Sequence, residues 1–202
     1  CYQITYKNDC NNTSPPVASC PIVLAATLNA DNSIALNWSS YIGFSSSPVT
    51  YTITRTGSDA SKQFNFSAGE TSFVDQEAAD DEKQQSYQYI ITATATGVLP
   101  AVSNTVFIIK EPNITYPTAF TPNGDGSNDV FRVYGQYVSN FNMSIYNRWG
   151  ELMFTTNNMN IGWDGKRNGV VMPEGTYVFV ATIGDKESRE FKKSGSVILL
   201  RK

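Results

Sequence analysis

Oxygen-bearing side chains alternate with glycines in one short stretch, and this spacing could support chemistry. Asn123, Asp125, Ser127 and Asp129 fall at every second position, and glycines occupy positions 124 and 126. Loops that bind Ca²⁺ place oxygen ligands at positions 1, 3 and 5 and use glycine to curve tightly. The four residues therefore form a candidate calcium site.

Two features favour an ordinary turn over a calcium site in this stretch. The first ligand position is Asn instead of Asp, and Val133 and Tyr134 stand where a calcium loop carries its Glu. Asn and Asp side chains also cap their own backbone in turns, and Gly accepts positive φ. We therefore favour a turn and no cofactor, with calcium as the alternative.

The chain has little equipment for catalysis. It contains no histidine, which removes the commonest general base, the commonest metal ligand and every Ser-His or Cys-His nucleophile pair. Carboxylate pairs and Ser-Lys arrangements remain formally possible. The net charge is -3, without a run of Lys or Arg to neutralise phosphates. We expect neither an enzyme nor a nucleic-acid-binding protein.

All three cysteines lie near the start of the chain, at Cys1, Cys10 and Cys20. If Tyr2–Lys7 and Pro15–Pro21 form a hairpin, Cys1 and Cys20 fall opposite each other and can form a disulfide. A Cys10–Cys20 bridge is the competing assignment. If Cys1 pairs with Cys20 instead, Cys10 could form a disulfide with a cysteine upstream of this sequence. At least one disulfide is expected, and with it an oxidising, extracytoplasmic setting.

The elements that hold these residues are predicted to be strands. Charged residues make up 16% of the chain, against about 25% in typical proteins, which argues against long amphipathic helices. Short alternating segments separated by turns indicate an all-β fold. We expect a hairpin remnant (1–20) followed by two antiparallel β-sandwich domains in tandem (21–111 and 112–202). No apolar stretch approaches the ~20 residues of a membrane helix, and the start at Cys1 suggests a C-terminal fragment of a longer protein.

The middle segment contains three strand motifs. These are the strand "SIALNW" with Trp38, the strand "YTITR" and the tyrosines of "YQYIITA". They follow each other in the order found in fibronectin type III modules, which this segment resembles. The resemblance implies a spacer or binding module. Trp38 is expected in the core.

The last ninety residues contain several short motifs in a distinctive order. The segments "FTPNGDGSND", "IYNRWGE", "GWDGKRNG", "PEGTYVF" and "KKSGSVILLRK" occur in the order found in the gliding motility-associated C-terminal domain. That family comprises the type B sorting domains of the type IX secretion system. The resemblance implies a β-sandwich that directs export across the outer membrane, and hence the C-terminal region of a cell-surface adhesin linked to gliding.

The resemblance also implies partners: the type IX translocon and an outer-membrane protein of the PorP/SprF kind. The final strand is the candidate recognition element, because it joins a basic cluster to an apolar run, and an exposed edge would admit a partner strand. A solvated strand whose lysines block aggregation is the alternative. The candidate residues are Lys192, Lys193, Gly195, Val197, Leu199, Arg201 and Lys202.

Other functions are compatible with the same sequence. Trp149 lies in a predicted turn and could stack on a sugar, whereas Trp163 is expected in the core. A calcium- or carbohydrate-binding adhesive module is therefore one alternative, and a glycan could also bind upstream regions. An accessory domain of a secreted polysaccharide hydrolase is another.

Overall fold

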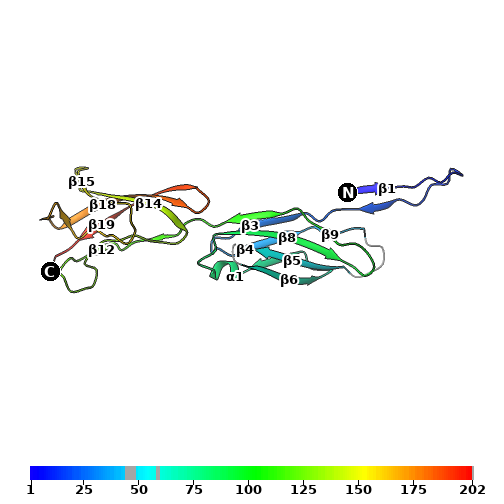
Figure 1. The fold of residues 1–202 in the computed structure, drawn as a ribbon, viewed down its shortest axis with the longest axis horizontal. Coiled ribbons are helices and arrows are strands. Elements are labelled where there is room, and N and C mark those ends of the chain that lie inside the picture. Colours follow the sequence, from blue (N-terminus) through cyan, green and yellow to red (C-terminus); the bar gives the residue numbers. More distant parts are fainter. Residues whose placement is uncertain (44–48, 58–59, 202) are drawn as a thin grey trace. The chain divides into compact units, whose positions relative to one another are not determined.

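A computed structural model describes residues 1–43, 49–57 and 60–201 of the chain (Figure 1). Lys202, a member of the predicted basic cluster, lies outside this range. The chain divides into two compact units, Cys1–Lys110 and Glu111–Lys202. Within the described residues the only helix is the single turn α1 (Glu77–Asp80), so the predicted all-β class is confirmed. No helix found there is long and apolar enough to span a membrane.

The chain begins with the predicted hairpin. Strands β1 (Tyr2–Ile4) and β2 (Val17–Ser19) pair antiparallel, and Cys1 and Cys20 form a disulfide with their Cα atoms 4.0 Å apart. This confirms the Cys1–Cys20 assignment. The Cys10–Cys20 alternative is wrong, because Cys10 lies in the turn and is a free, exposed thiol.

Two antiparallel sheets build the rest of the first unit. The smaller sheet has the order β3-β4-β7, and the larger has the order β10-β8-β5-β6, with β9 also paired to β8. Their strands are β3 (Leu24–Leu28), β4 (Ile34–Trp38), β5 (Thr50–Thr56), β6 (Ser61–Ser67), β7 (Ser72–Asp75), β8 (Ser86–Thr94), β9 (Ala101–Val102) and β10 (Val106–Ile109).

The alternation along these strands places the core as predicted. Ile34, Leu36 and Trp38 of β4 are buried. They belong to one apolar cluster with Tyr51 and Ile53 of β5 and with the inward residues of β8. Because successive strand side chains point to opposite faces, every second residue of each strand is committed to this core.

The second unit is organised around a single sheet of five strands. Its order is β12-β19-β18-β14-β15, parallel between β12 and β19 and antiparallel elsewhere. The strands are β12 (Ala119–Phe120), β14 (Val138–Tyr146), β15 (Leu152–Thr156), β18 (Gly175–Asp185) and β19 (Glu190–Leu199). Two short pairs complete the unit: β11 (Ile114–Thr115) with β13 (Tyr134–Gly135), and β16 (Lys166–Arg167) with β17 (Val170–Val171).

An aromatic core covers one face of this sheet. Trp163 is fully buried, its ring packs edge-on against Tyr177, and its indole N–H donates to the Lys166 carbonyl at 2.8 Å. Phe120, Phe131 and Phe179 extend the cluster. Trp163 is thus a core residue, as expected from its position between two glycines.

Candidate functional site

The final strand β19 pairs with β18 along its whole length. Val197 and Leu199 are fully buried, whereas Lys192 and Lys193 are exposed. A partner that binds the folded unit can contact the two lysines. It cannot contact the side chains of Val197 and Leu199, which contribute to the core instead.

Gly195 is required by packing. A Cβ atom at this position would lie 2.7 Å from Cε1 of Phe179 and 2.9 Å from the hydroxyl oxygen of Tyr116. These two rings meet edge-on over the glycine, with centroids 4.6 Å apart. A larger side chain would force the rings apart, so Gly195 belongs to the structure of the strand more than to its surface.

Arg201 is tied back into the unit. Its guanidinium donates to the carbonyl of Met172 at 3.0 Å and to that of Gly165 at 3.4 Å, and its backbone N–H donates to the Glu174 carboxylate. Arg201 therefore fastens the end of the chain to the loops before β18. The predicted basic cluster is divided into two exposed lysines and one structural arginine.

The outer edge of β19 is only partly covered. β12 pairs with Ile198 and Leu199 alone, and the Ile198 N–H donates outward to the Thr118 carbonyl. Because backbone groups alternate in direction, those of Lys192 and Ser194 point to the same side. Among the described strands none pairs with them there, so this part of β19 is an open edge.

The Asn123–Asp129 loop satisfies its own carboxylates. Asp129 accepts the N–H groups of Gly124 and Gly126 at 2.6 and 2.7 Å. Asp125 accepts hydrogen bonds from the Ser127 N–H and from the Asn123 side-chain amide. Both donors lower the pKa of Asp125, and the Ser127 N–H has the larger effect. Both glycines have positive φ. This is the geometry of the predicted turn, and calcium binding here stays a prediction.

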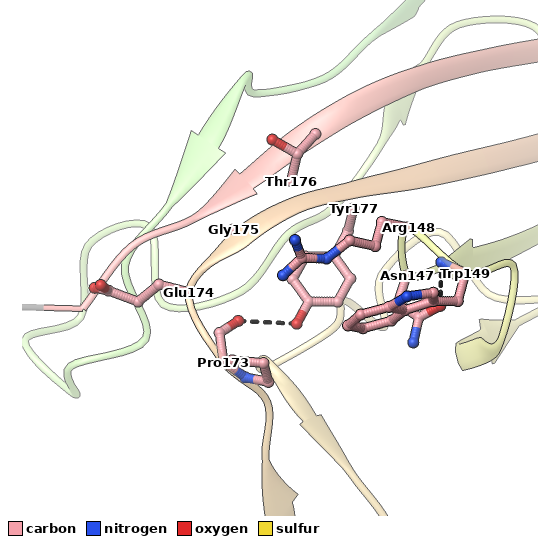
Figure 2. Close-up of a pocket in the computed structure, with 8 residues that line it drawn as sticks. All are labelled: Asn147, Arg148, Trp149, Pro173, Glu174, Gly175, Thr176 and Tyr177. Atoms are coloured by element: carbon pink, nitrogen blue, oxygen red, sulfur yellow. Dashed lines mark hydrogen bonds between the residues drawn. The ribbon is translucent and has the colours of Figure 1, made fainter.

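Sequence reasoning identified Trp149 but not the pocket beside it. The indole is 70% exposed and lines a cavity of about 190 Å³ between the β14–β15 turn (Asn147–Trp149) and the start of β18 (Pro173–Tyr177). Figure 2 shows the Trp149 ring near Tyr177, whose hydroxyl donates to the Pro173 carbonyl, and the Glu174 side chain at the far end. Only folding could reveal this site, because its two segments are far apart in sequence.

Comparison with known proteins finds a family model that matches part of the second unit. Residues 114–199 match the family model described as CHU_C Type IX secretion signal domain. The protein is accordingly exported and located at the cell surface, and the signal implies an interaction with the secretion machinery. No curated protein matches the chain significantly in sequence.

Solved structures resemble the chain only distantly. A segment of two fibronectin type III domains from chicken tenascin is 12% identical, with a TM-score of 0.49 over 87% of this chain and 97% of that one. A bacterial ice-binding adhesin of 1.5 MDa is 12% identical, with a TM-score of 0.32 over 99% and 74%. Pectate lyase PelI from Erwinia chrysanthemi is 18% identical, with a TM-score of 0.35 over 52% of this chain and 30% of the enzyme. At these scores none of the likenesses indicates a shared function.

Proposed function

We propose that the unit Glu111–Lys202 is the signal that delivers this protein through the type IX translocon, and that an outer-membrane protein of the PorP/SprF kind recognises it. The family match over residues 114–199 carries this proposal. The matched residues fall within one compact unit that has its own core. A signal of this kind acts as a folded surface and needs no catalytic group.

The exported protein is proposed to be a non-enzymatic surface adhesin with a role in gliding. The absence of histidine from the sequence argues against most nucleophilic and acid–base chemistry within these residues. The β-sandwich of the first unit suits a spacer between the signal and the adhesive regions. Folds of this kind host many functions, so the adhesive role follows from the export class and not from the sandwich itself.

Within the signal, the accessible part of β19 is the proposed recognition element. It combines the exposed Lys192 and Lys193 with an open backbone edge. A partner strand that pairs with such an edge gains main-chain hydrogen bonds, and acidic side chains on that partner would complement the lysines.

A reporter fusion tests the proposal. The 202-residue chain is placed behind a periplasmic signal peptide and a fluorescent protein in a bacterium with a type IX system, and surface fluorescence is measured. We expect surface delivery in the parent strain and periplasmic retention in a strain without the translocon. Equal surface delivery in both strains, or none in either, would overturn the proposal.

Charge reversal tests the role of β19 better than deletion does. Removing Ser194–Lys202 also removes Val197 and Leu199 from the core, so a truncated chain could fail simply because it unfolds. The double variant Lys192→Glu/Lys193→Glu keeps the core and should reduce delivery. The matched control Lys166→Glu/Arg167→Glu, on the exposed strand β16, should not.

A further inference from the structure

Trp149 is exposed although the turn that carries it does not depend on the ring. The Asn147 side-chain oxygen accepts the N–H groups of Trp149 and Glu151 at 3.0 and 2.9 Å, and Gly150 supplies the positive φ of the turn. These contacts use the backbone of Trp149 and leave its indole 70% exposed. A large aromatic ring held in water on a firmly bonded turn is typical of a residue that contacts another molecule.

The pocket beside Trp149 is small. Its volume is about 190 Å³, below the roughly 300–1,000 Å³ of pockets that hold drug-sized molecules. The buried Tyr177 lines it together with the turn Asn147–Trp149 and the segment Pro173–Thr176 (Figure 2). A space of this size suits one ring-sized ligand better than it suits a protein surface.

Arg148 brings unused hydrogen-bond donors to this pocket. Its guanidinium carbon lies 4.6 Å from the Trp149 ring centroid, so the group covers one face of the indole, and the other face is open to solvent. Its charge also acts on the Tyr177 hydroxyl: burial raises the pKa of Tyr177, and the charges of Arg201 and Arg148 oppose that rise. Among the described residues, no hydrogen bond or ion pair uses the Arg148 guanidinium. A ligand in the pocket can therefore accept hydrogen bonds from it.

Glu174 brings an acceptor to the same pocket. One of its carboxylate oxygens accepts the Arg201 N–H, and the second oxygen has no partner among the described residues. The Tyr177 hydroxyl already donates to the Pro173 carbonyl at 2.8 Å, so it can serve a ligand only as a further acceptor. The pocket thus offers donors from Arg148 and acceptors from Glu174 and Tyr177.

These groups favour a neutral ring that carries hydroxyl groups. Glu174 would repel an anion and Arg148 would repel a cation, and a purely apolar ring would leave both charged groups without hydrogen bonds. A sugar has the complementary chemistry. The C–H groups on one of its faces stack on the Trp149 indole, while neighbouring hydroxyls accept from Arg148 and donate to Glu174.

We propose that the pocket bordered by Trp149, Arg148 and Glu174 binds one neutral sugar residue of a glycan. Trp149 is the stacking platform, Arg148 the donor and Glu174 the acceptor. The inference goes beyond the export function, since none of these side chains belongs to the part of β19 proposed to meet the translocon. With one ring and a few hydrogen bonds the affinity should be weak, with a Kd on the order of 1 mM.

An NMR titration of the purified full chain tests the site. The sequence contains three tryptophans, each with one indole N–H signal, and the Trp149 signal is assigned by its absence from Trp149→Ala. Methyl glycosides of glucose, galactose, mannose and N-acetylglucosamine are added up to about 100 mM, which saturates a millimolar site. At least one glycoside should shift the Trp149 signal saturably, while the signals of the buried Trp38 and Trp163 stay in place.

Two results of this titration would overturn the proposal. The first is the absence of a saturable shift with all four glycosides. The second is an equal shift with cyclohexanol or with free glycine, because the pocket would then select an apolar ring or a zwitterion instead of a sugar.

Matched variants identify the side chains that bind. Trp149→Ala should weaken the Kd about tenfold or more, and Arg148→Gln and Glu174→Gln should each weaken it about threefold. Binding by the variants is read from the backbone N–H signal of Gly175, which lines the pocket. The control Arg167→Gln, at an exposed position of β16, should bind as the parental chain does. Parental binding by Trp149→Ala would contradict the stacking role.

The reporter fusion separates the sugar site from the export signal. Trp149→Ala should keep the parental thermal transitions and should reach the surface as the parental chain does. Lost delivery of a Trp149→Ala chain that still folds would overturn the proposal, because the secretion machinery would then occupy the pocket. A parental chain that binds glycosides but is not exported would refute the proposed function and would support the sugar site.

Discussion

The two units present different side chains at equivalent places on their largest sheets. On the outer face of the first unit, β5 and β8 place threonines opposite each other, such as Thr52 beside Thr92 and Thr50 beside Thr94, and the latter pair shares a hydrogen bond of 2.8 Å. On the outer face of the second unit, Val178 and Ile198 occupy such positions. Thr and Val are both β-branched and both suit strands. The outer face of the first unit also carries exposed apolar side chains, since Val102 pairs with Thr92 and Phe107 pairs with Gln88. The two outer faces therefore differ in their threonine ladder and not in whether apolar side chains are present.

The interiors of the two units also differ, and here the first unit is the one that buries charged groups. The first unit buries an ion pair: Arg55 donates to both carboxylate oxygens of Asp75 at 2.8 Å, and Tyr89 donates to the same carboxylate at 2.9 Å. Burial, followed by the charge of Asp75, raises the pKa of Tyr89, which keeps its hydroxyl a donor. The second unit relies on its aromatic core around Trp163. A substitution can disrupt one interior without changing the other. We therefore expect such a substitution to shift the thermal transition of its own unit alone.

The largest expected effect separates two tryptophans of the second unit. Trp163→Ala removes a fully buried ring and leaves a cavity, which typically costs about 3–5 kcal/mol and lowers the melting temperature of a unit this size by more than about 12 °C. Trp149→Ala removes an exposed ring and should change stability by less than about 0.5 kcal/mol. Calorimetry of the full chain should show one transition lost or shifted in Trp163→Ala and none in Trp149→Ala. Equal shifts would mean that Trp149 is structural.

The alternation of apolar and polar residues along the strands predicts which side chains form the core. It gives no answer where successive residues of a strand are all apolar. Trp38 and Trp163 were placed in the core correctly, because the first lies in a clear alternating strand and the second between turn glycines. The inward side of β19 was ambiguous from sequence, since Val197, Ile198, Leu199 and Leu200 are all apolar. Pairing with β18 decides it.

The candidate site was less predictable than the core. Arg201 looked like a free cation, but its guanidinium donates to carbonyls from distant loops. The Trp149 pocket likewise needs Tyr177, which is brought to it only by the β14–β18 pairing. Local patterns contain no information about such contacts between segments far apart in the chain.

The next effect is confined to the first unit. Asp75→Ala leaves the Arg55 guanidinium and the Tyr89 hydroxyl without their buried acceptor, and breaking a buried pair in this way costs about 3–5 kcal/mol. The transition of the first unit should fall steeply while that of the second is unchanged. Glu82→Gln, which changes an exposed carboxylate of the same unit, is the matched control and should have no measurable effect. A concerted fall of both transitions would contradict the independence of the units.

Acid should destabilise both units. Hydrogen bonds lower the pKa of Asp31, Glu70 and Glu77 in the first unit. Burial opposes the ionisation of Asp81, but the N–H groups of Lys83 and Gln84 and the Tyr87 hydroxyl outweigh it and lower its pKa too. In the second unit the Ser127 N–H and the Asn123 side-chain amide lower the pKa of Asp125.

The sign of this effect follows from linkage. A carboxyl whose pKa is lower in the folded state stabilises that state above its unfolded pKa, about 4, and the stabilisation is lost as the pH falls toward the folded pKa. Between pH 5 and pH 2 the melting temperatures of both units should therefore decline. Because the groups of the first unit are mostly exposed, their contribution should be modest. A melting temperature of the first unit that stays constant over this range would show that these hydrogen bonds do not stabilise it.

The smallest expected effect concerns divalent cations. In the Asn123–Asp129 loop both oxygens of Asp129 already accept backbone N–H groups, and within the described residues no three acidic or cysteine side chains gather as a metal site. Excess chelator should therefore leave both transitions within about 1 °C of their values in millimolar Ca²⁺, since only a ligand that binds the folded state raises its stability. Asp125→Asn serves as a control, because it should lower stability slightly and equally with and without Ca²⁺. A rise in the second transition with Ca²⁺ that Asp125→Asn abolishes would establish the calcium site and would show that the loop rearranges to free its carboxylates. The second unit would then differ from the first in having a stability that depends on a bound metal ion.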